Sequence, residues 1–477
     1  MTRLPSGSAA LSCQGRPRGN RVEQGKTETI SRRSLLQAVG ALGASAVLGG
    51  CANGTQATDH DLLEYWYYFA DADQEAYFVE HFIEGYDGST PVRLTVKPSN
   101  TIDRLIQTAL AAGKGPSLVV TPGPSQVKAY DDAGFLADLD PYAEKYGWHD
   151  LFAPWAMAAS AVDGKLATLP TSYESMVFYS NPATLEKHGL ALPKDGDEFD
   201  AFCTEAKGRG LVPISAGNAD YRASNEWFLT VALNHIAGPQ AVYQALTGEI
   251  PWTDPVFVDT VARMSDWFTK GWFGGGVDIY FTNPTRKIYQ QLANGEAASM
   301  ISGTWDFANL GGYFGQAAGN DATWEWSTLP PLADGVPEEV WDLGVGQSTG
   351  INAHSANIDA AAEFLNFMTT DIGLLTGAIE AINFQPPPID VSADDFPTGV
   401  DRRTLELYTQ MPRARTIGYT TWTFYPQKTE TYMINQIERV FTGLMTPAEF
   451  CEGVQLRFAA ELEAGQVPAV PEPGGLG

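Results

Sequence analysis

Residues 92–121 read VRLTVKPSNTIDRLIQTALAAGKGPSLVVT, and this stretch is the clearest indication of the architecture. In its middle, apolar residues recur at the spacing of one helical face: Ile102, Leu105, Ile106, Ala109 and Leu110. The segments on either side, 92–97 and 116–121, are short and rich in Val and Leu, which is typical of strands. Strand, helix and strand at this spacing predict a parallel sheet covered by helices, so we expect an α/β fold.

The same alternation continues in both directions along the chain. Before this stretch we expect a buried, aromatic-rich strand over 62–69 and a helix over 74–86. Far downstream, apolar stripes predict helices over 357–370 and 433–444. Thr446-Pro447-Ala448-Glu449 then has the N-cap, first-turn proline and capping-box glutamate of a further helix. Ordered structure should run almost to residue 465, followed by a flexible Pro/Gly-rich tail over 467–477.

The N-terminal 50 residues have the pattern of an export signal. Ser31-Arg32-Arg33-Ser34 supplies paired arginines, an apolar stretch follows over 38–48, and Leu48-Gly49-Gly50-Cys51 resembles the lipobox of bacterial lipoproteins. We therefore expect residues 1–50 to be a twin-arginine lipoprotein signal peptide, Cys51 to be lipidated and 51–60 to form a tether. A membrane anchor is the alternative, but roughly 15 apolar residues fall short of the roughly 20 that span a bilayer.

Charge and cysteine content narrow the function further. The leader contains 7 of the 30 basic and 2 of the 57 acidic residues, which leaves 23 against 55 and a net charge of −32. Such a chain repels phosphate backbones, so no nucleic-acid partner is expected. After residue 50 only Cys51, Cys203 and Cys451 occur. With Cys51 lipidated, the other two either pair or are separate core residues, and the sequence favours the core slightly.

One catalytic motif matches literally but lacks its context. Gly346-Gln347-Ser348-Thr349-Gly350 fits G-x-S-x-G, the nucleophile elbow of hydrolases, which requires a strand leading into a helix with an acid and then a histidine downstream. The segment continues as a strand-like run. His354 is the only later histidine, with no carboxylate between it and Ser348. No metal-ligand histidine spacing and no phosphate loop occur, so we expect no metal, no cofactor and no enzyme activity.

Aromatic residues mixed with short polar ones recur at the ends of predicted elements. Five such groups are Trp66-Tyr67-Tyr68, Tyr173-Glu174-Ser175, Asn225-Glu226-Trp227, Thr304-Trp305-Asp306 and Trp422-Thr423-Phe424-Tyr425. Flat rings stack on the apolar faces of a sugar, while carboxylates, amides and hydroxyls bind its hydroxyl groups. The composition of these groups therefore favours a carbohydrate ligand, although any one of the aromatics is more often a core residue.

Several segments together resemble the extracellular solute-binding proteins of bacterial ABC importers, in the sugar-binding group (family 1) that includes maltose-binding protein. The likeness covers most of residues 62–462 in the expected order. It rests on Gly295–Trp305, on Ser327–Pro331, on Gly344–Asn352 with the helix after it, on Leu169–Pro193 and on Phe441–Pro447. Two segments depart from the family pattern: Tyr179-Ser180-Asn181, and the proline-rich Gln385–Pro388.

This resemblance implies a two-lobed α/β fold of the type II periplasmic-binding-protein kind, each lobe a mostly parallel sheet flanked by helices. The N-terminal lobe would comprise residues 61–171 and 349–387, and the C-terminal lobe 172–348 and 388–466. The chain would cross between lobes near Thr171, Ser348 and Pro387. Solute would lie in the cleft between lobes that close about a hinge.

The resemblance also implies a set of ligand-binding residues, among which Trp305 aligns with an aromatic that stacks on sugar in this family. The predicted ligand contacts are Trp305, Asp306, Tyr425, Trp422, Glu226, Trp227, Tyr173, Glu174, Tyr68, Asp71, Ser125, Gln126, Gln347 and Ser348.

The function implied is that of a monomeric, lipid-anchored receptor outside the cytoplasm, which captures a sugar and delivers it to the membrane subunits of an importer. Two alternatives stay open. The same fold could bind another solute, such as a polyamine, a peptide or a glycerol-phosphate ester. Alternatively, because 55 carboxylates guarantee chance Asp/Glu pairs, the chain could be a secreted enzyme acting on glycans.

Overall fold

The computed structural model describes residues 62–221 and 225–474, and its first sheet begins with the predicted strand–helix–strand alternation. Strands β1 (Leu63–Tyr67), β2 (Val92–Val96) and β3 (Leu118–Thr121) are joined through α2 (Ala72–Phe78), a π-helical turn η1 (Val79–Ile83) and α3 (Ile102–Ala111). β1 pairs in parallel with both β2 and β3, which confirms the βαβ prediction. On α3, Ile102, Ile106 and Leu110 are buried, while Leu105 lies at the edge of the apolar face and is 38% exposed.

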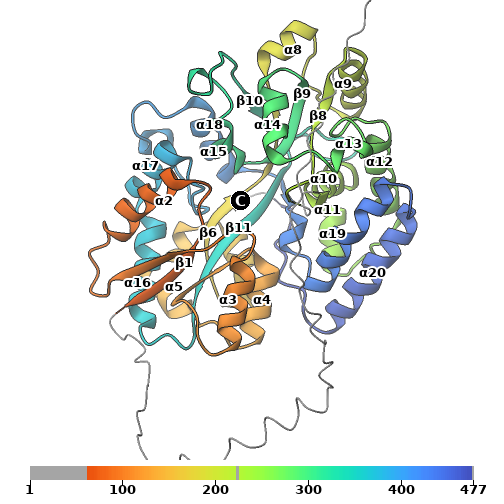
Figure 1. The fold of residues 1–477 in the computed structure, drawn as a ribbon. Helices are drawn as coiled ribbons and strands as arrows, with labels where there is room; N and C mark the ends of the chain where they lie inside the picture. Colours follow the sequence, from red (N-terminus) through yellow and green to blue (C-terminus); the bar gives the residue numbers. More distant parts are fainter. Residues whose placement is uncertain (1–61, 222–224, 475–477) are drawn as a thin grey trace, which may run out of the picture. The chain divides into compact units, whose positions relative to one another are not determined.

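A long strand, β11 (Trp341–Ile351), completes this sheet and joins segments that lie far apart in the sequence. It runs antiparallel to β3 and to β6 (Leu169–Glu174), and parallel to β12 (Ile417–Tyr419). The resulting order is β12-β11-β3-β1-β2, with β6 also paired to β11. β11 is visible near the centre of Figure 1.

The second sheet has the order β10-β7-β9-β8, built from β7 (Met176–Ser180), β8 (Val212–Ser215), β9 (Ala297–Gly303) and β10 (Glu325–Ser327). Only β8 and β9 pair in parallel, whereas β7 is antiparallel to both of its neighbours. This differs from the expected mostly parallel sheet. The reason is that β7 pairs with β9 and β10, which lie far from it in the sequence, so local patterns do not set its direction.

The remaining elements are mainly helices, with one small two-stranded sheet. The two strands are β4 (Ala161–Val162) and β5 (Lys165–Leu166). The helices up to the middle of the chain are α4 (Pro124–Asp132), α5 (Asp140–Tyr146), α6 (Trp148–Leu151), α7 (Pro154–Ala159), α8 (Pro182–His188), α9 (Gly196–Gly208), α10 (Asn225–Ala232), η3 (Leu233–Ala237), α11 (Pro239–Leu246) and α12 (Pro255–Thr269). Those that follow are α13 (Val277–Tyr280), α14 (Thr285–Ala293), α15 (Asp306–Leu310), η4 (Gln316–Ala318), α16 (Ile358–Thr370), α17 (Ile372–Ile382), η5 (Ala393–Asp395), α18 (Arg402–Gln410), η6 (Met411–Arg413), η7 (Thr421–Thr423), α19 (Gln427–Phe441) and α20 (Pro447–Glu463).

The two C-terminal helices confirm the sequence prediction in detail. α19 and α20 lie side by side and both contact α12 (Figure 1). The Thr446 side chain accepts a hydrogen bond from the Glu449 backbone, and the Glu449 carboxylate accepts one from the Thr446 backbone, so the capping box is formed. This reciprocal bonding satisfies two of the free N–H groups at the start of α20.

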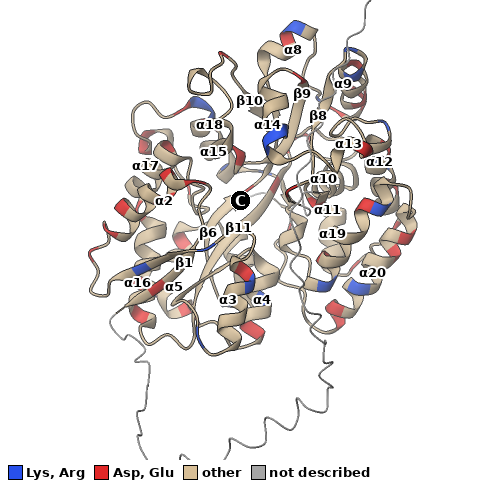
Figure 2. Cartoon of the chain, in the orientation of Figure 1, with Lys and Arg blue, Asp and Glu red and all other residues tan. Residues whose placement is uncertain are grey.

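The core is extensive, and most acidic residues lie outside it; Glu174, Glu226, Asp306, Asp342 and Glu461 are buried. Cys203 and Cys451 are both free and buried, as the core alternative predicted. Figure 2 shows Asp and Glu spread over helices such as α2, α16 and α20 rather than gathered at one place. Within residues 62–221 and 225–474, no helix is both long and apolar enough to cross a bilayer. The predicted signal peptide and Cys51 lie outside the described residues.

Candidate functional site

Four aromatic rings from three separate parts of the chain lie in contact with one another, and we call them the aromatic row. They are Tyr221, Trp227, Trp305 and Trp422. The ring centroids are 5.8 Å apart for Tyr221 and Trp227, 5.2 Å for Trp227 and Trp305, and 6.3 Å for Trp305 and Trp422. The three indoles are partly exposed and Tyr221 is 49% exposed. Rings that contact one another yet keep accessible surface can stack on a ligand.

The supporting structure of the row comes from the second sheet and its helices. Trp227 lies in the first turn of α10, Trp422 lies in η7, and Trp305 follows the end of β9. The buried Tyr179 hydroxyl donates to the carbonyl of Gly303 at 2.8 Å, and the Thr304 N–H donates to the Ser175 carbonyl at 3.0 Å. These bonds hold the backbone just before Trp305, so its ring projects from a rigid element.

Polar groups at the end of β1 form a second part of the site. The Tyr67 hydroxyl donates to Gln347 Oε1 at 2.8 Å, and Gln347 Nε2 donates to the Tyr68 hydroxyl at 2.6 Å. All three side chains are partly exposed. Desolvation nevertheless raises the pKa of Tyr68 to about 12. Tyr68 is therefore accessible to water but surrounded by protein, as expected of a side chain that lines a binding site.

Four carboxyl groups complete the site: Asp103, Glu174, Glu226 and Glu430, which we call the carboxyl cluster. Glu174, at the end of β6, is 8% exposed, and burial raises its pKa to about 8. Glu226, in the first turn of α10, is 6% exposed. Burial and the nearby Glu430 raise its pKa well above the usual range. Burial and Asp103 raise the pKa of Glu430 to about 7.

Electrostatic effects on Tyr221 and Tyr68 link these parts of the site. Although Tyr221 is half exposed, burial raises its pKa, and Glu226, Glu430, Tyr68 and Glu174 raise it further. Asp103 and Glu174 likewise raise the pKa of Tyr68. The site therefore combines residues attached to the first sheet, such as Tyr68 and Glu174, with residues attached to the second, such as Tyr221 and Glu226.

Seven of the fourteen predicted contacts belong to this arrangement: Trp305, Trp422, Trp227, Glu226, Glu174, Tyr68 and Gln347. Sequence reasoning missed Tyr221, Glu430, Asp103 and Tyr67. A signal for Asp103 existed, because it lies in the first turn of the helix after β2, and ligands of α/β proteins bind outside the carboxyl ends of strands. Ser125 and Gln126 lie partly exposed in the first turn of α4 and stay predictions.

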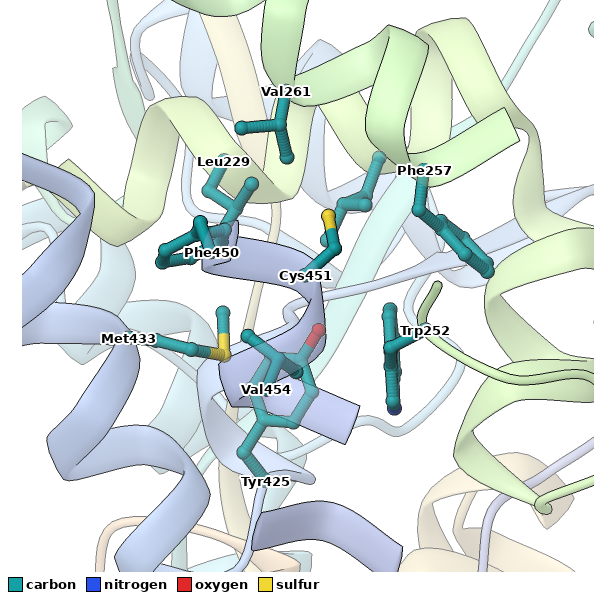
Figure 3. A pocket seen from close by; sticks show the side chains of 10 residues that line it. Leu229, Trp252, Phe257, Val261, Tyr425, Met433, Phe450, Cys451 and Val454 are labelled. Atoms are coloured by element: carbon teal, nitrogen blue, oxygen red, sulfur yellow. The ribbon is translucent and has the colours of Figure 1, made fainter. Parts of the chain in front are cut away.

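Four predicted contacts are buried among protein side chains. Tyr425 is 1% exposed and lines a small apolar cavity of about 10 Å³ with Trp252 and Cys451 (Figure 3). Tyr173 is equally buried and faces Tyr408. For both residues, an accessible ligand contact was the wrong expectation, because their rings pack in the interior.

The other two corrections concern polar residues that are buried and already have partners within the protein. Asp306 is 1% exposed and accepts hydrogen bonds from the Tyr289 hydroxyl and Asn309 Nδ2. Ser348 is fully buried inside β11, and its hydroxyl shares a hydrogen bond with Thr121 at 2.7 Å. Asp71 is exposed and caps α2 by accepting from two backbone N–H groups, and it stays a prediction. Because Gly346–Gly350 lies within a continuous strand, it does not form the strand-to-helix turn of a nucleophile elbow.

No group of three His, Cys, Asp or Glu side chains suitable for a metal ion occurs within the described residues 62–221 and 225–474. The site is instead built from accessible rings, amide and phenol groups, and carboxyls. Such a set binds and orients a small solute through stacking and hydrogen bonds.

The fold and the site define a solute-binding protein with the type II periplasmic-binding-protein architecture. The structure is similar to that of a chitin oligosaccharide binding protein, with a TM-score of 0.72 and 19% identity over 84% of this chain and 98% of that one. It is also similar to the sugar-binding protein MalE from Xanthomonas citri, with a TM-score of 0.64 and 16% identity over 85% and 98% of the two chains. The predicted fold is therefore confirmed.

The sequence matches the family model for bacterial extracellular solute-binding proteins over residues 63–373, and the chain belongs to this family. A relative in Mesorhizobium japonicum, described as a probable sugar-binding periplasmic protein, is 31% identical over 208 residues. A relative of the same description in Brucella melitensis is 26% identical over 119 residues. These alignments cover 42% and 25% of this chain, and 47% and 28% of the respective relatives.

Proposed function

We propose that this protein is the sugar receptor of an ABC importer and binds its ligand between the aromatic row and the carboxyl cluster. The observation that carries the proposal is the contact of Trp227, Trp305 and Trp422, three indoles that keep accessible surface. Pyranose rings have apolar faces that stack on indoles, and the polar groups beside them suit sugar hydroxyls. The relatives described as sugar-binding support the same ligand class.

The expected working cycle is closure of two lobes around the ligand. The predicted lobe boundaries, 61–171 with 349–387 and 172–348 with 388–466, place Tyr68 and Glu226 on opposite lobes. A ligand that contacts both lobes only when they are closed shifts the population toward the closed state. The membrane subunits of the importer would then recognise that state and receive the sugar, while the receptor acts as a monomer and leaves the sugar unchanged.

Export and attachment form part of the proposal. The paired arginines and the lipobox-like end at Cys51 support export and lipidation of Cys51, with 51–60 as the tether. The receptor would thus act outside the cytoplasm, held to the membrane by its lipid. Incorporation of labelled fatty acid into the wild-type chain but not into Cys51→Ala would test this part.

Among the other solutes, a glycerol-phosphate ester fits poorly, because four carboxyls would repel it. An enzyme acting on glycans is also disfavoured. The chain belongs to a family of solute-binding proteins, and Ser348 is buried within a strand, so the G-x-S-x-G segment supplies no accessible nucleophile. Polyamines remain the competing class, and they enter the experiment below as a ligand.

The proposal is tested by thermal unfolding in the presence of mono- and oligosaccharides, with spermidine as the competing ligand. A bound saccharide should raise Tm, because it stabilises only the folded state. Trp305→Ala should remove at least nine-tenths of that affinity. The matched control is Trp66→Ala. Trp66 is also partly exposed, but adjacent side chains alternate across a strand, so it projects from the face of β1 opposite to Tyr67. Stabilisation by spermidine alone, or equal effects of the two variants, would contradict the proposal.

A further inference from the structure

Among residues 62–221 and 225–474, the carboxyl cluster has no compensating partner. No side-chain oxygen of Asp103, Glu174, Glu226 or Glu430 takes part in a hydrogen bond or ion pair with a residue in 62–221 or 225–474. The ion pairs of this region join lysines and arginines to other acids, such as Glu64, Asp200 and Glu325. Within the described residues, none of the four acids has an ion pair.

The other buried acids of the described chain make the contrast clear. Glu461 accepts hydrogen bonds from the backbone N–H groups of Lys428 and Thr429 and from the Thr429 hydroxyl. Asp306 is bonded to Tyr289 and Asn309, and Asp342 lies 3.3 Å from His235 Nε2. Buried carboxyls ordinarily have such partners, because an unpaired charge is costly to desolvate.

The Asp342 oxygens have no hydrogen bond, although His235 lies at ion-pair distance. Glu174 and Glu226 have neither a hydrogen bond nor an ion pair among the described residues, and both belong to the site. Each is more than nine-tenths buried, yet their carboxyl oxygens are absent from the fully enclosed, unbonded atoms of the described chain, so they reach accessible space. Tyr221 is near both, and it also contacts Trp227 of the aromatic row. Glu226 also directly precedes Trp227 in the first turn of α10, so the unpartnered carboxyls lie near the stacking rings.

We propose that the solute is a saccharide with a protonated amino group, which binds the carboxyl cluster through its ammonium while its ring stacks on the aromatic row. This inference rests on the proposed sugar-receptor function and names the class of sugar. An ammonium group supplies a positive charge and three donors, which is what unpaired carboxylates require. Indole faces also attract cations, so the two parts of the site favour the same ligand.

The probes are glucosamine oligosaccharides of two to four units and their N-acetylated counterparts, because acetylation removes the positive charge and keeps the rings. Affinities are measured by calorimetry at pH 7 in two buffers with different ionisation enthalpies. The free-amine form should bind at least tenfold more tightly than the acetylated form. Its binding should also release protons, because a cation favours the ionised form of nearby carboxyls.

Two variants test whether the carboxyl cluster causes the preference for the free amine. Glu226→Gln and Glu430→Gln should each reduce the preference for the free amine at least fivefold and change binding of the acetylated form less than threefold. Glu430 is only partly exposed at the start of α19, so its replacement keeps the fold even if Glu226→Gln is unstable. Glu186→Gln, an exposed position on α8, is the control and should change neither affinity.

The outcomes separate this inference from the function on which it rests. Equal or tighter binding of acetylated or other neutral saccharides would overturn the amine proposal and leave the sugar receptor intact. Binding of spermidine without any saccharide would overturn both, as would the absence of binding by every saccharide tested. Tight amine binding that survives Glu226→Gln and Glu430→Gln unchanged would also overturn the assignment to the carboxyl cluster.

Discussion

The indole of Trp305 lies directly against the backbone of Gly303. A Cβ atom placed on Gly303 would lie 2.0 Å from Cζ3 of the Trp305 ring, far inside van der Waals contact. The absence of a side chain at residue 303 is therefore what allows the ring to lie back on β9 and to meet Trp227 and Trp422. A small residue two positions before the tryptophan thus determines the geometry of the aromatic row.

Replacing Gly303 by alanine should displace the Trp305 ring. We expect a loss of about 1–3 kcal/mol in the free energy of unfolding from overpacking, and at least a threefold loss of affinity for the saccharide that binds the wild type. Tryptophan fluorescence, denaturant unfolding and calorimetry measure the three effects. Gly311→Ala is the control, because a Cβ there meets no atom within 4 Å and its φ is helical. Wild-type affinity in Gly303→Ala would refute this role of the glycine.

The hydroxyl groups of Tyr67 and Tyr173 should differ in their contributions to stability and ligand affinity. Tyr67→Phe removes the donor to Gln347 Oε1, and we expect a cost of about 0.5–1.5 kcal/mol in stability and a fall in ligand affinity, because Gln347 also holds Tyr68. The Tyr173 hydroxyl is buried without a hydrogen-bond partner among the described residues. Tyr173→Phe should therefore leave affinity unchanged and stability unchanged or higher. Urea unfolding and calorimetry of both variants test the contrast, and a loss of affinity in Tyr173→Phe would restore it as a ligand contact.

The stability of the ligand-free protein should fall as the pH rises toward 8. Burial raises the pKa of Glu174 from 4.5 to about 8, so between these values the folded protein holds a proton that the unfolded chain has released. Stability from this group is complete below the unfolded pKa and is lost as the pH rises through about 8. The slope for one group is at most about 1.4 kcal/mol per pH unit.

Denaturant unfolding at pH 5, 6.5 and 8 measures this slope. Glu174→Gln cannot ionise, so the difference between its free energy of unfolding and that of the wild type should change with pH in favour of the variant at pH 8. Glu186→Gln supplies the baseline for an exposed glutamate. A constant difference between Glu174→Gln and the wild type across this range would show that Glu174 does not hold its proton as described.

Local sequence patterns were sufficient to predict much of the fold. The apolar stripe of Ile102, Ile106 and Leu110 predicted α3, and Thr446 with Glu449 predicted the start of α20, because helical periodicity and capping depend on residues three or four positions apart. The direction of β7 was not predictable in this way, since strand pairing joins residues that are distant in the sequence.

For the candidate site as well, local patterns predicted the residue types but not which of those residues are accessible. Trp305 and Tyr425 are both aromatic residues near the end of an element, yet one is accessible and the other lines an internal cavity. Glu226 and Asp306 are both acids beside a tryptophan, but among the described residues only Asp306 of the two has hydrogen-bond partners. Segments distant in the sequence, such as the one that contains Tyr289, determined whether each side chain is accessible or has partners in the interior.

The sequence by itself determined the α/β class, the order of the first strands and helices, and a supply of aromatic and carboxyl side chains at the ends of elements. Only the tertiary structure decided which of those side chains lie together at an accessible site and which pack in the interior. The physical reason is the sequence separation over which each effect acts. Propensity, periodicity and capping act over a few residues. Burial, and with it the pairing or isolation of a carboxyl group, depends on neighbours that arrive from hundreds of residues away.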